Sequence, residues 1–156
     1  MLEARRAHMQ ITMEQIKKLR EETGAGVMDV RKALTECKGD EGKAREWIKQ
    51  KAMVRAEEKS ERETAEGYVF AYVHFNGKVG ALVKLACETD FVAKTEDFQK
   101  LGKELAMQVA SMRPKDAAEL MAQDYLRDPS QTIENLVKAV SGKTGENVRI
   151  LDIAVL

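Results

Sequence analysis

The sequence predicts an α+β protein, with an N-terminal bundle of three helices, a charged helical linker, and a three-stranded antiparallel sheet packed with helices. Three patterns support this prediction. Apolar residues recur at helical spacing over residues 13–53. Beyond residue 66 they alternate as in strands on both sides of Asn76-Gly77, which is a strong hairpin-turn signal. The β-branched tail over residues 148–156 supplies a third strand.

The same patterns divide the chain into four segments. Residues 1–12 form a leader without a clear pattern, either non-native or disordered. Residues 13–53 form the three-helix domain, and residues 54–66 form a charged helical linker with hardly an apolar residue. Residues 67–156 form the α+β core domain.

Composition limits the kinds of function that the chain can have. The 156 residues carry 26 basic and 26 acidic side chains, and this balance argues against a surface that follows nucleic-acid phosphates. The two cysteines, Cys37 and Cys87, lie far apart without CxxC spacing, so we expect neither a disulfide framework nor a thiolate metal site. No apolar run is long enough to span a bilayer, and the leader lacks the apolar middle of a signal peptide. We therefore expect a cytoplasmic protein with a protein partner.

The first domain contains three apolar stripes separated by turn residues. Gly24 tolerates the left-handed conformation that ends the first helix, the second ends near Gly39, and Asp40 can cap the third. The inward residues are Ile16 and Leu19, then Val27, Val30, Ala33 and Leu34, then Ala44, Trp47 and Ile48. Trp47 is the expected core anchor. Met28 falls between the inward positions of the second helix, so it is either a plain surface residue or a deformable contact for a partner.

In the second domain, one long helix should pack on the hairpin. Its apolar face runs from Phe98 to Met112, and Pro114 prevents its continuation. Asp116 and Glu119 have capping-box-like spacing before a brief helical turn, and Asp128-Pro129-Ser130 indicates a loop. A further helix precedes the C-terminal strand.

The segment Cys87-Glu88-Thr89-Asp90-Phe91-Val92-Ala93 joins the return strand of the hairpin to the long helix. Thr89 and Asp90 can both accept a backbone hydrogen bond at a helix start. Phe91 follows at a position where a side chain is more easily presented than buried, although an ordinary core role is the alternative.

The sequence contains no catalytic constellation. The two histidines are far apart, no serine lies in a nucleophile elbow, and no phosphate-binding glycine loop is present. Gly24-Ala25-Gly26 is too short to cradle a phosphate, and His74 has no second ligand at metal-binding spacing. We expect no enzyme activity, no cofactor and no metal, which leaves binding to another macromolecule.

Three segments, in this order, resemble the translation elongation factor Ts family of bacteria and organelles. They are Leu19 to Leu34, Thr89-Asp90-Phe91-Val92-Ala93, and Lys143-Thr144-Gly145-Glu146-Asn147-Val148. The resemblance runs from about Met13 to the last residue. It implies a guanine-nucleotide exchange factor that binds elongation factor Tu and promotes GDP release by disturbing its magnesium and phosphate site.

The resemblance also implies which residues contact elongation factor Tu. The three-helix domain is similar to ubiquitin-associated domains, and Arg20, Val27 and Met28 match the family positions that dock on the Tu GTPase domain. The segment from Thr89 through Asp90, Phe91 and Val92 to Ala93 matches the family unchanged, and there the acid and the ring press against that domain near the magnesium site. Two residues depart from the common pattern: Val27 stands where many members have Met, and Ala86 where the family usually has Asn.

Size is the larger departure from the family. Long members carry a second core subdomain and a coiled-coil hairpin, and this chain has room for neither. It resembles the short members in which two chains pair, so we expect a noncovalent homodimer formed through the sheet. The alternative, from a different class, is a ubiquitin-associated-like adaptor for some other protein, which leaves Thr89 to Ala93 unexplained.

Overall fold

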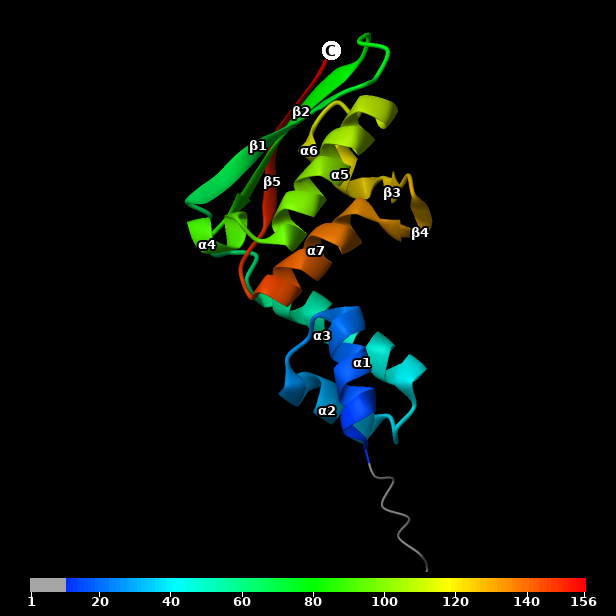
Figure 1. Cartoon of the computed structure of the whole chain (residues 1–156). Coiled ribbons are helices and arrows are strands. Elements are labelled where there is room, and N and C mark those ends of the chain that lie inside the picture. Colours follow the sequence, from blue (N-terminus) through cyan, green and yellow to red (C-terminus); the bar gives the residue numbers. More distant parts are fainter. Residues whose placement is uncertain (1–10) are drawn as a thin grey trace, which may run out of the picture. The chain divides into compact units, whose positions relative to one another are not determined.

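The computed structural model describes residues 11–156, and these divide into two compact units between Lys51 and Ala52 (Figure 1). The predicted leader, residues 1–12, lies outside the described residues except for its last two. The α+β fold class is confirmed: helices come first, and a three-stranded antiparallel sheet with helices follows.

The first unit is built from α1 (Met13–Thr23), α2 (Val27–Glu36) and the first part of α3 (Glu41–Glu58). Thr12 begins α1 with a capping box: its hydroxyl accepts from Gln15 N at 3.2 Å, and Gln15 Oε1 accepts from Thr12 N at 3.1 Å. Gly24 ends α1 at φ 67°, as the sequence predicted.

The core of the first unit consists of aliphatic side chains, namely Ile16, Leu19, Val30, Ala33, Leu34, Ala44 and Ile48. Trp47 was expected to anchor this core, and that expectation is wrong: the side chain is half-buried at the edge of the cluster. Ala44 and Ile48, four residues apart, form the inner face of α3, so Trp47 lies on the flank of that face. There the Lys51 ammonium lies 4.8 Å from the ring centroid.

Residues 52–66 group with the second unit, although composition suggested a separating linker over residues 54–66. Helix α3 continues to Glu58, and Ala56 is buried in this otherwise charged stretch. Beyond it, the Asn147 side-chain amide donates to the backbone carbonyls of Ser60 and Arg62 at 3.1 and 2.7 Å. The unit boundary therefore falls earlier than expected, because packing and hydrogen bonds attach this segment to the sheet unit.

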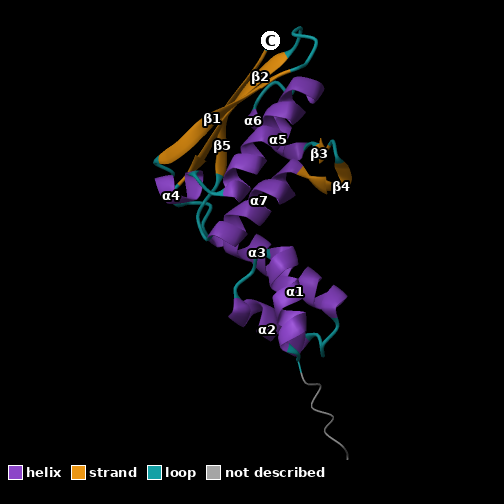
Figure 2. Ribbon diagram, in the orientation of Figure 1, coloured by secondary structure: helices purple, strands orange, loops and turns teal. Residues whose placement is uncertain are grey.

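The second unit contains the sheet and the remaining helices (Figure 2). In chain order the elements are β1 (Glu66–Val73), β2 (Gly80–Cys87), α4 (Asp90–Ala93), α5 (Glu96–Met112), α6 (Ala117–Ala122), β3 (Asp124–Tyr125), β4 (Asp128–Thr132), α7 (Ile133–Thr144) and β5 (Arg149–Val155). The sheet has the order β1-β2-β5 and is antiparallel throughout. The hairpin at Asn76-Gly77 and the C-terminal strand are both confirmed.

One face of this sheet packs on α5 and the other is open. On the covered face, the rings of Phe70 and Phe98 lie 5.9 Å apart, and Gly102 lets α5 approach because a Cβ there would come within 2.2 Å of the Phe70 ring. On the opposite face several apolar side chains are exposed in the described part of the chain: Val69, Val73, Leu82 and Leu151. This face of the sheet is therefore partly apolar and exposed.

A short two-stranded hairpin replaces the loop predicted at Asp128-Pro129-Ser130, because β4 pairs with β3. The fully buried side chain of Gln108 on α5 holds the hairpin, donating to Asp124 O at 3.0 Å and accepting from Leu126 N at 3.0 Å. The loop predicted at Asp128-Pro129-Ser130 is therefore wrong: these residues belong to β4, and the turn lies just before them at Leu126 and Arg127.

Candidate protein-binding site

The predicted strand-to-helix corner forms a sharp turn at one end of the sheet. Thr89 follows β2 in an extended conformation and caps α4, with its hydroxyl accepting from Val92 N at 3.4 Å. Thr95 repeats this cap for α5, accepting from Phe98 N at 3.4 Å. Two caps within seven residues reverse the chain, so that α4 is a single turn at the surface.

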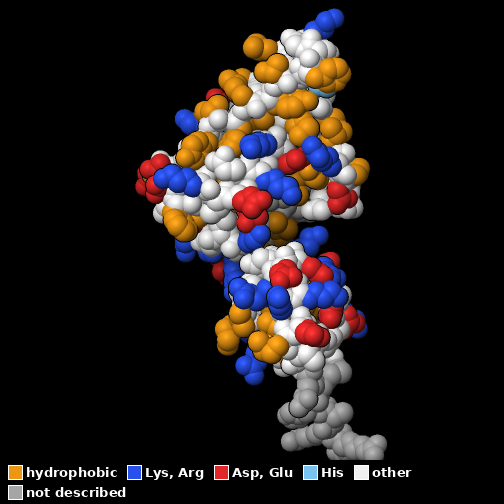
Figure 3. Space-filling model, viewed as in Figure 1, with side chains coloured by type: hydrophobic (Ala, Val, Ile, Leu, Met, Phe, Trp, Pro, Cys, Tyr) orange, Lys and Arg blue, Asp and Glu red, His pale blue; other side chains and the backbone are white. Residues whose placement is uncertain are grey.

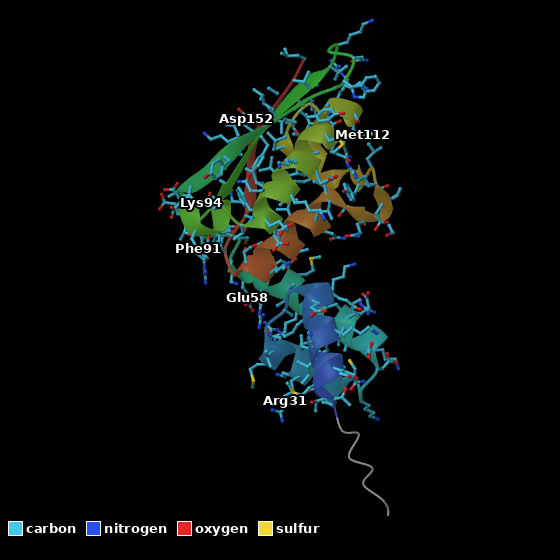
Figure 4. All side chains as sticks on the ribbon, in the orientation of Figure 1. Arg31, Glu58, Phe91, Lys94, Met112 and Asp152 are labelled. Carbon is cyan, nitrogen blue, oxygen red and sulfur yellow. The ribbon has the colours of Figure 1, made fainter. Side chains whose placement is uncertain are left out.

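The corner presents Phe91 and buries the two residues after it. Phe91 is 79% exposed, whereas Val92 is 5% and Ala93 1% exposed. Figure 4 labels Phe91 on α4 and Lys94, the residue that follows α4. Of the two readings of Phe91, the structure selects the presented ring. Val92 and Ala93 had been placed among the partner contacts, but their burial assigns their side chains to anchoring the corner.

Asp90 gives the corner a negative charge beside the ring. Its carboxylate accepts from the Lys94 ammonium at 2.8 Å, across one helical turn, and both side chains are exposed. The Lys94 hydrogen bond is the main cause that lowers the pKa of Asp90, and the same bond raises the pKa of Lys94. Asp90 is therefore ionised at neutral pH, and it can exchange Lys94 for a partner's charge without first losing a proton.

The predicted N-terminal contact residues lie on the surface of the first unit. Arg20 is exposed, and Val27 and Met28 are 42% and 73% exposed, which is unusual for apolar side chains of this size. The expectation that Val27 faces the core is therefore wrong. Arg20 and Val27 line an open groove of about 610 Å³ together with Met13, also exposed. Met28 lies outside the groove lining. The outward direction predicted for Met28 is thus confirmed, and its role as a contact stays a prediction.

Charges of both signs surround these apolar surfaces in each unit (Figure 3). Ion pairs such as Lys18–Glu41 at 2.6 Å and Lys143–Asp97 at 2.8 Å place opposite charges next to each other on this surface. A surface of this kind fits a protein better than a nucleic-acid backbone.

Among the described residues, no three His, Cys, Asp or Glu side chains gather as a metal site would require. Cys87 is buried behind the corner, where its thiol donates to Thr89 O at 3.1 Å. Burial raises the pKa of this thiol to about 11, so it remains protonated at neutral pH. Likewise, no helix among residues 11–156 is long and apolar enough to cross a membrane.

The sequence predicted no contact between the segment from Lys143 to Val148 and the corner. In the structure this segment contains the last two residues of α7 and the turn before β5, where the Glu146 carboxylate accepts hydrogen bonds from Glu88 and Thr89 at the corner. Glu146 is separated in sequence from Thr89 by 57 residues and from Glu88 by 58, so no local pattern could have indicated these hydrogen bonds.

Comparison with known proteins places the chain among translation elongation factors, proteins of the elongation step of protein biosynthesis. A family profile described as "Elongation factor TS" matches residues 88–156, which include the corner. Elongation factor Ts of Thermotoga neapolitana is 39% identical, covering 91% of this chain and 94% of the relative. Elongation factor Ts of Aquifex aeolicus is 40% identical over 91% of this chain and 51% of the relative, and that of Oleidesulfovibrio alaskensis is 53% identical over 67% and 52%. The chain belongs to the elongation factor Ts family.

Proposed function

We propose that this protein is a guanine-nucleotide exchange factor that binds elongation factor Tu in its GDP-bound and nucleotide-free forms and promotes GDP release. The observation that carries the proposal is the corner itself, where a 79% exposed Phe91 stands on a turn anchored by the buried Val92 and Ala93. An exposed aromatic ring on a fixed backbone costs little entropy to bind, which is what an effective contact with a partner requires.

Asp90 and Phe91 would act by displacing the surroundings of the magnesium ion bound to elongation factor Tu. Mg²⁺ requires near-ideal octahedral oxygen geometry and bridges the protein to the nucleotide phosphates, so a small displacement weakens nucleotide binding strongly. By linkage, the nucleotide weakens the binding of the factor to the same extent. The factor therefore accelerates replacement of GDP without selecting GTP.

Arg20, Val27 and Met28 would supply a second contact from the first unit. Val27 and Met28 offer apolar surface that adapts to a partner helix, and Arg20 offers charge and hydrogen bonds at the groove. This contact would hold the GTPase while the corner acts on its nucleotide site. We place the whole reaction in the cytoplasm, where translation elongation takes place.

A stopped-flow assay tests the proposal. Elongation factor Tu loaded with a fluorescent GDP is mixed with excess unlabelled GDP and with increasing amounts of this protein. We expect GDP release to accelerate at substoichiometric amounts of the protein. Release at the spontaneous rate, together with capture of a partner other than Tu through the three-helix unit, would instead favour the ubiquitin-associated-like adaptor.

We further propose that two copies of the chain pair through the open face of the sheet. Val69, Val73 and Leu82 are 59%, 70% and 47% exposed on one face, and a second copy would remove them from water. Sedimentation equilibrium should show a noncovalent dimer at micromolar concentrations, and Val73→Asp should shift it to monomer. A wild-type protein that stays monomeric at tens of micromolar contradicts this pairing.

A further inference from the structure

The backbone that leads into the Phe91 corner is held by one side chain from a distant part of the chain. Glu146 Oε2 accepts from the backbone N–H groups of Glu88 and Thr89 at 3.0 and 2.9 Å. Glu146 Oε1 accepts from the Thr89 hydroxyl at 2.6 Å. These three bonds use both carboxylate oxygens, and all three end on the two residues that precede α4.

The hydroxyl of Thr89 connects this carboxylate to α4. Because the hydroxyl donates its proton to Glu146, its lone pairs are left to accept from Val92 N–H, which is the cap of α4. Helix α4 has four residues, too few to be stable without such support. The direction of Phe91 therefore depends on Glu146 through Thr89.

The segment that carries Glu146 is itself fixed to the rest of the second unit. Gly145 ends α7 at φ 80°, and the Ser141 hydroxyl donates to Glu146 O at 2.5 Å. The next residue, Asn147, is 3% exposed and donates its backbone N–H to Glu88 Oε1 at 2.7 Å. Glu88 and Glu146 thus make reciprocal bonds between the end of β2 and the turn before β5.

We propose that Glu146 is a positioning residue for the exchange function: it holds residues 88 and 89 so that the unliganded protein already presents Phe91 in the orientation that the GTPase meets. The inference rests on the exchange function proposed above. It assigns Glu146 no contact with elongation factor Tu. Its effect on exchange comes from the fraction of molecules in which the corner is ordered before binding.

Three substitutions separate positioning from a general loss of stability. Glu146→Ala removes every acceptor. Glu146→Gln keeps a carbonyl oxygen for the two backbone N–H groups and an amide that can donate to the Thr89 hydroxyl. Glu146→Asp keeps the charge and shortens the reach by one methylene. As a matched control, Glu134→Ala removes a carboxylate of α7 that pairs with Lys138 at 2.9 Å.

The first readout is GDP release from elongation factor Tu as a function of the concentration of the exchange factor. For Glu146→Ala we expect the half-saturating concentration to rise about tenfold to a hundredfold, while the release rate at saturation changes little, because binding restores the corner. Glu146→Gln should recover most of the loss, Glu146→Asp should not, and Glu134→Ala should match the wild type. Wild-type half-saturation in all three Glu146 variants would overturn the proposal. If Glu146→Ala does not fold, the half-saturating concentrations of Glu146→Gln and Glu146→Asp decide the matter. If both equal the wild-type value, the proposal is overturned.

The second readout needs no partner. Hydrogen exchange of the backbone amides of Glu88, Thr89 and Val92 should quicken in Glu146→Ala, while amides of the β1–β2 ladder keep their protection. Unchanged protection at these three amides would refute the positioning role. If wild-type protein fails to release GDP, the proposed exchange function fails, and this second readout still decides whether Glu146 orders the corner.

Discussion

Truncation of Phe91 to alanine should strongly reduce exchange activity and leave the fold intact. The ring is 79% exposed, so only about one fifth of it is covered. A fully buried Phe→Ala change costs about 3–5 kcal/mol, and one fifth of that is at most about 1 kcal/mol. The melting temperature of the second unit should therefore fall by no more than about 8 °C. Exchange efficiency should fall about thirtyfold to several hundredfold, the range expected for an aromatic residue that contributes about 2–4 kcal/mol to an interface.

Two other phenylalanines provide matched controls for this experiment. Phe75, 93% exposed beside the turn that closes the β1–β2 hairpin, lies at the opposite end of the two strands from the corner. Phe75→Ala should change neither melting nor exchange. Phe98 is fully buried, and Phe98→Ala should cost about 3–5 kcal/mol of stability. Melting curves and GDP-release rates come from the same samples. Full exchange activity in a folded Phe91→Ala protein, or a melting loss as large as that of Phe98→Ala, would refute the reasoning.

Three further predictions concern pH, packing and thiol reactivity. The Lys94 hydrogen bond lowers the pKa of Asp90 from its usual value of 3.8. The small stabilisation from this pair is therefore present above pH 3.8 and is lost as the pH falls through the lower pKa of the folded state. An NMR titration of Asp90 with its midpoint at or above 3.8 would contradict this prediction. Gly102→Ala should destabilise the second unit by about 1–3 kcal/mol in denaturant melts, because the added Cβ would lie 2.2 Å from the Phe70 ring; a stabilised variant would show that helix propensity outweighs the clash. Iodoacetamide at pH 8 should modify Cys37 well before Cys87, which is fully buried with a thiol pKa of about 11, and mass spectrometry showing equal rates in native protein would argue against this burial.

The sequence allowed the elements and their order to be predicted because their signals are local. The Asn76-Gly77 turn, the glycine that ends α1 and the arrest of α5 at Arg113 before Pro114 each depend on a few neighbouring residues. Such patterns express backbone preferences and the periods of helix and strand, which hold wherever the segment lies in the fold. The same local reasoning placed Trp47 too deep, because a period identifies a face of a helix without showing how completely its neighbours cover it.

The candidate site was predicted in part for the same reason. The sequence located the corner at Thr89 and Asp90 from capping chemistry, and it left Phe91 between core and surface. Those two readings differ only in where one ring points relative to residues distant in sequence, so the tertiary structure had to decide between them. It exposed Phe91 and buried Val92 and Ala93.

By itself, then, the sequence determined the α+β class, the strand-to-helix corner and the resemblance to elongation factor Ts, all of which depend on residues adjacent along the chain. Only the tertiary structure revealed what supports the corner. Glu146 bonds to Glu88 and Thr89, which are 58 and 57 residues away in sequence. Gln108 bonds to Asp124 and Leu126, which are 16 and 18 residues away, and these bonds stabilise the β3–β4 pair. Hydrogen bonds across such separations form only where folding brings a donor and an acceptor together. The periodicity of a short segment does not show which distant residues it will contact.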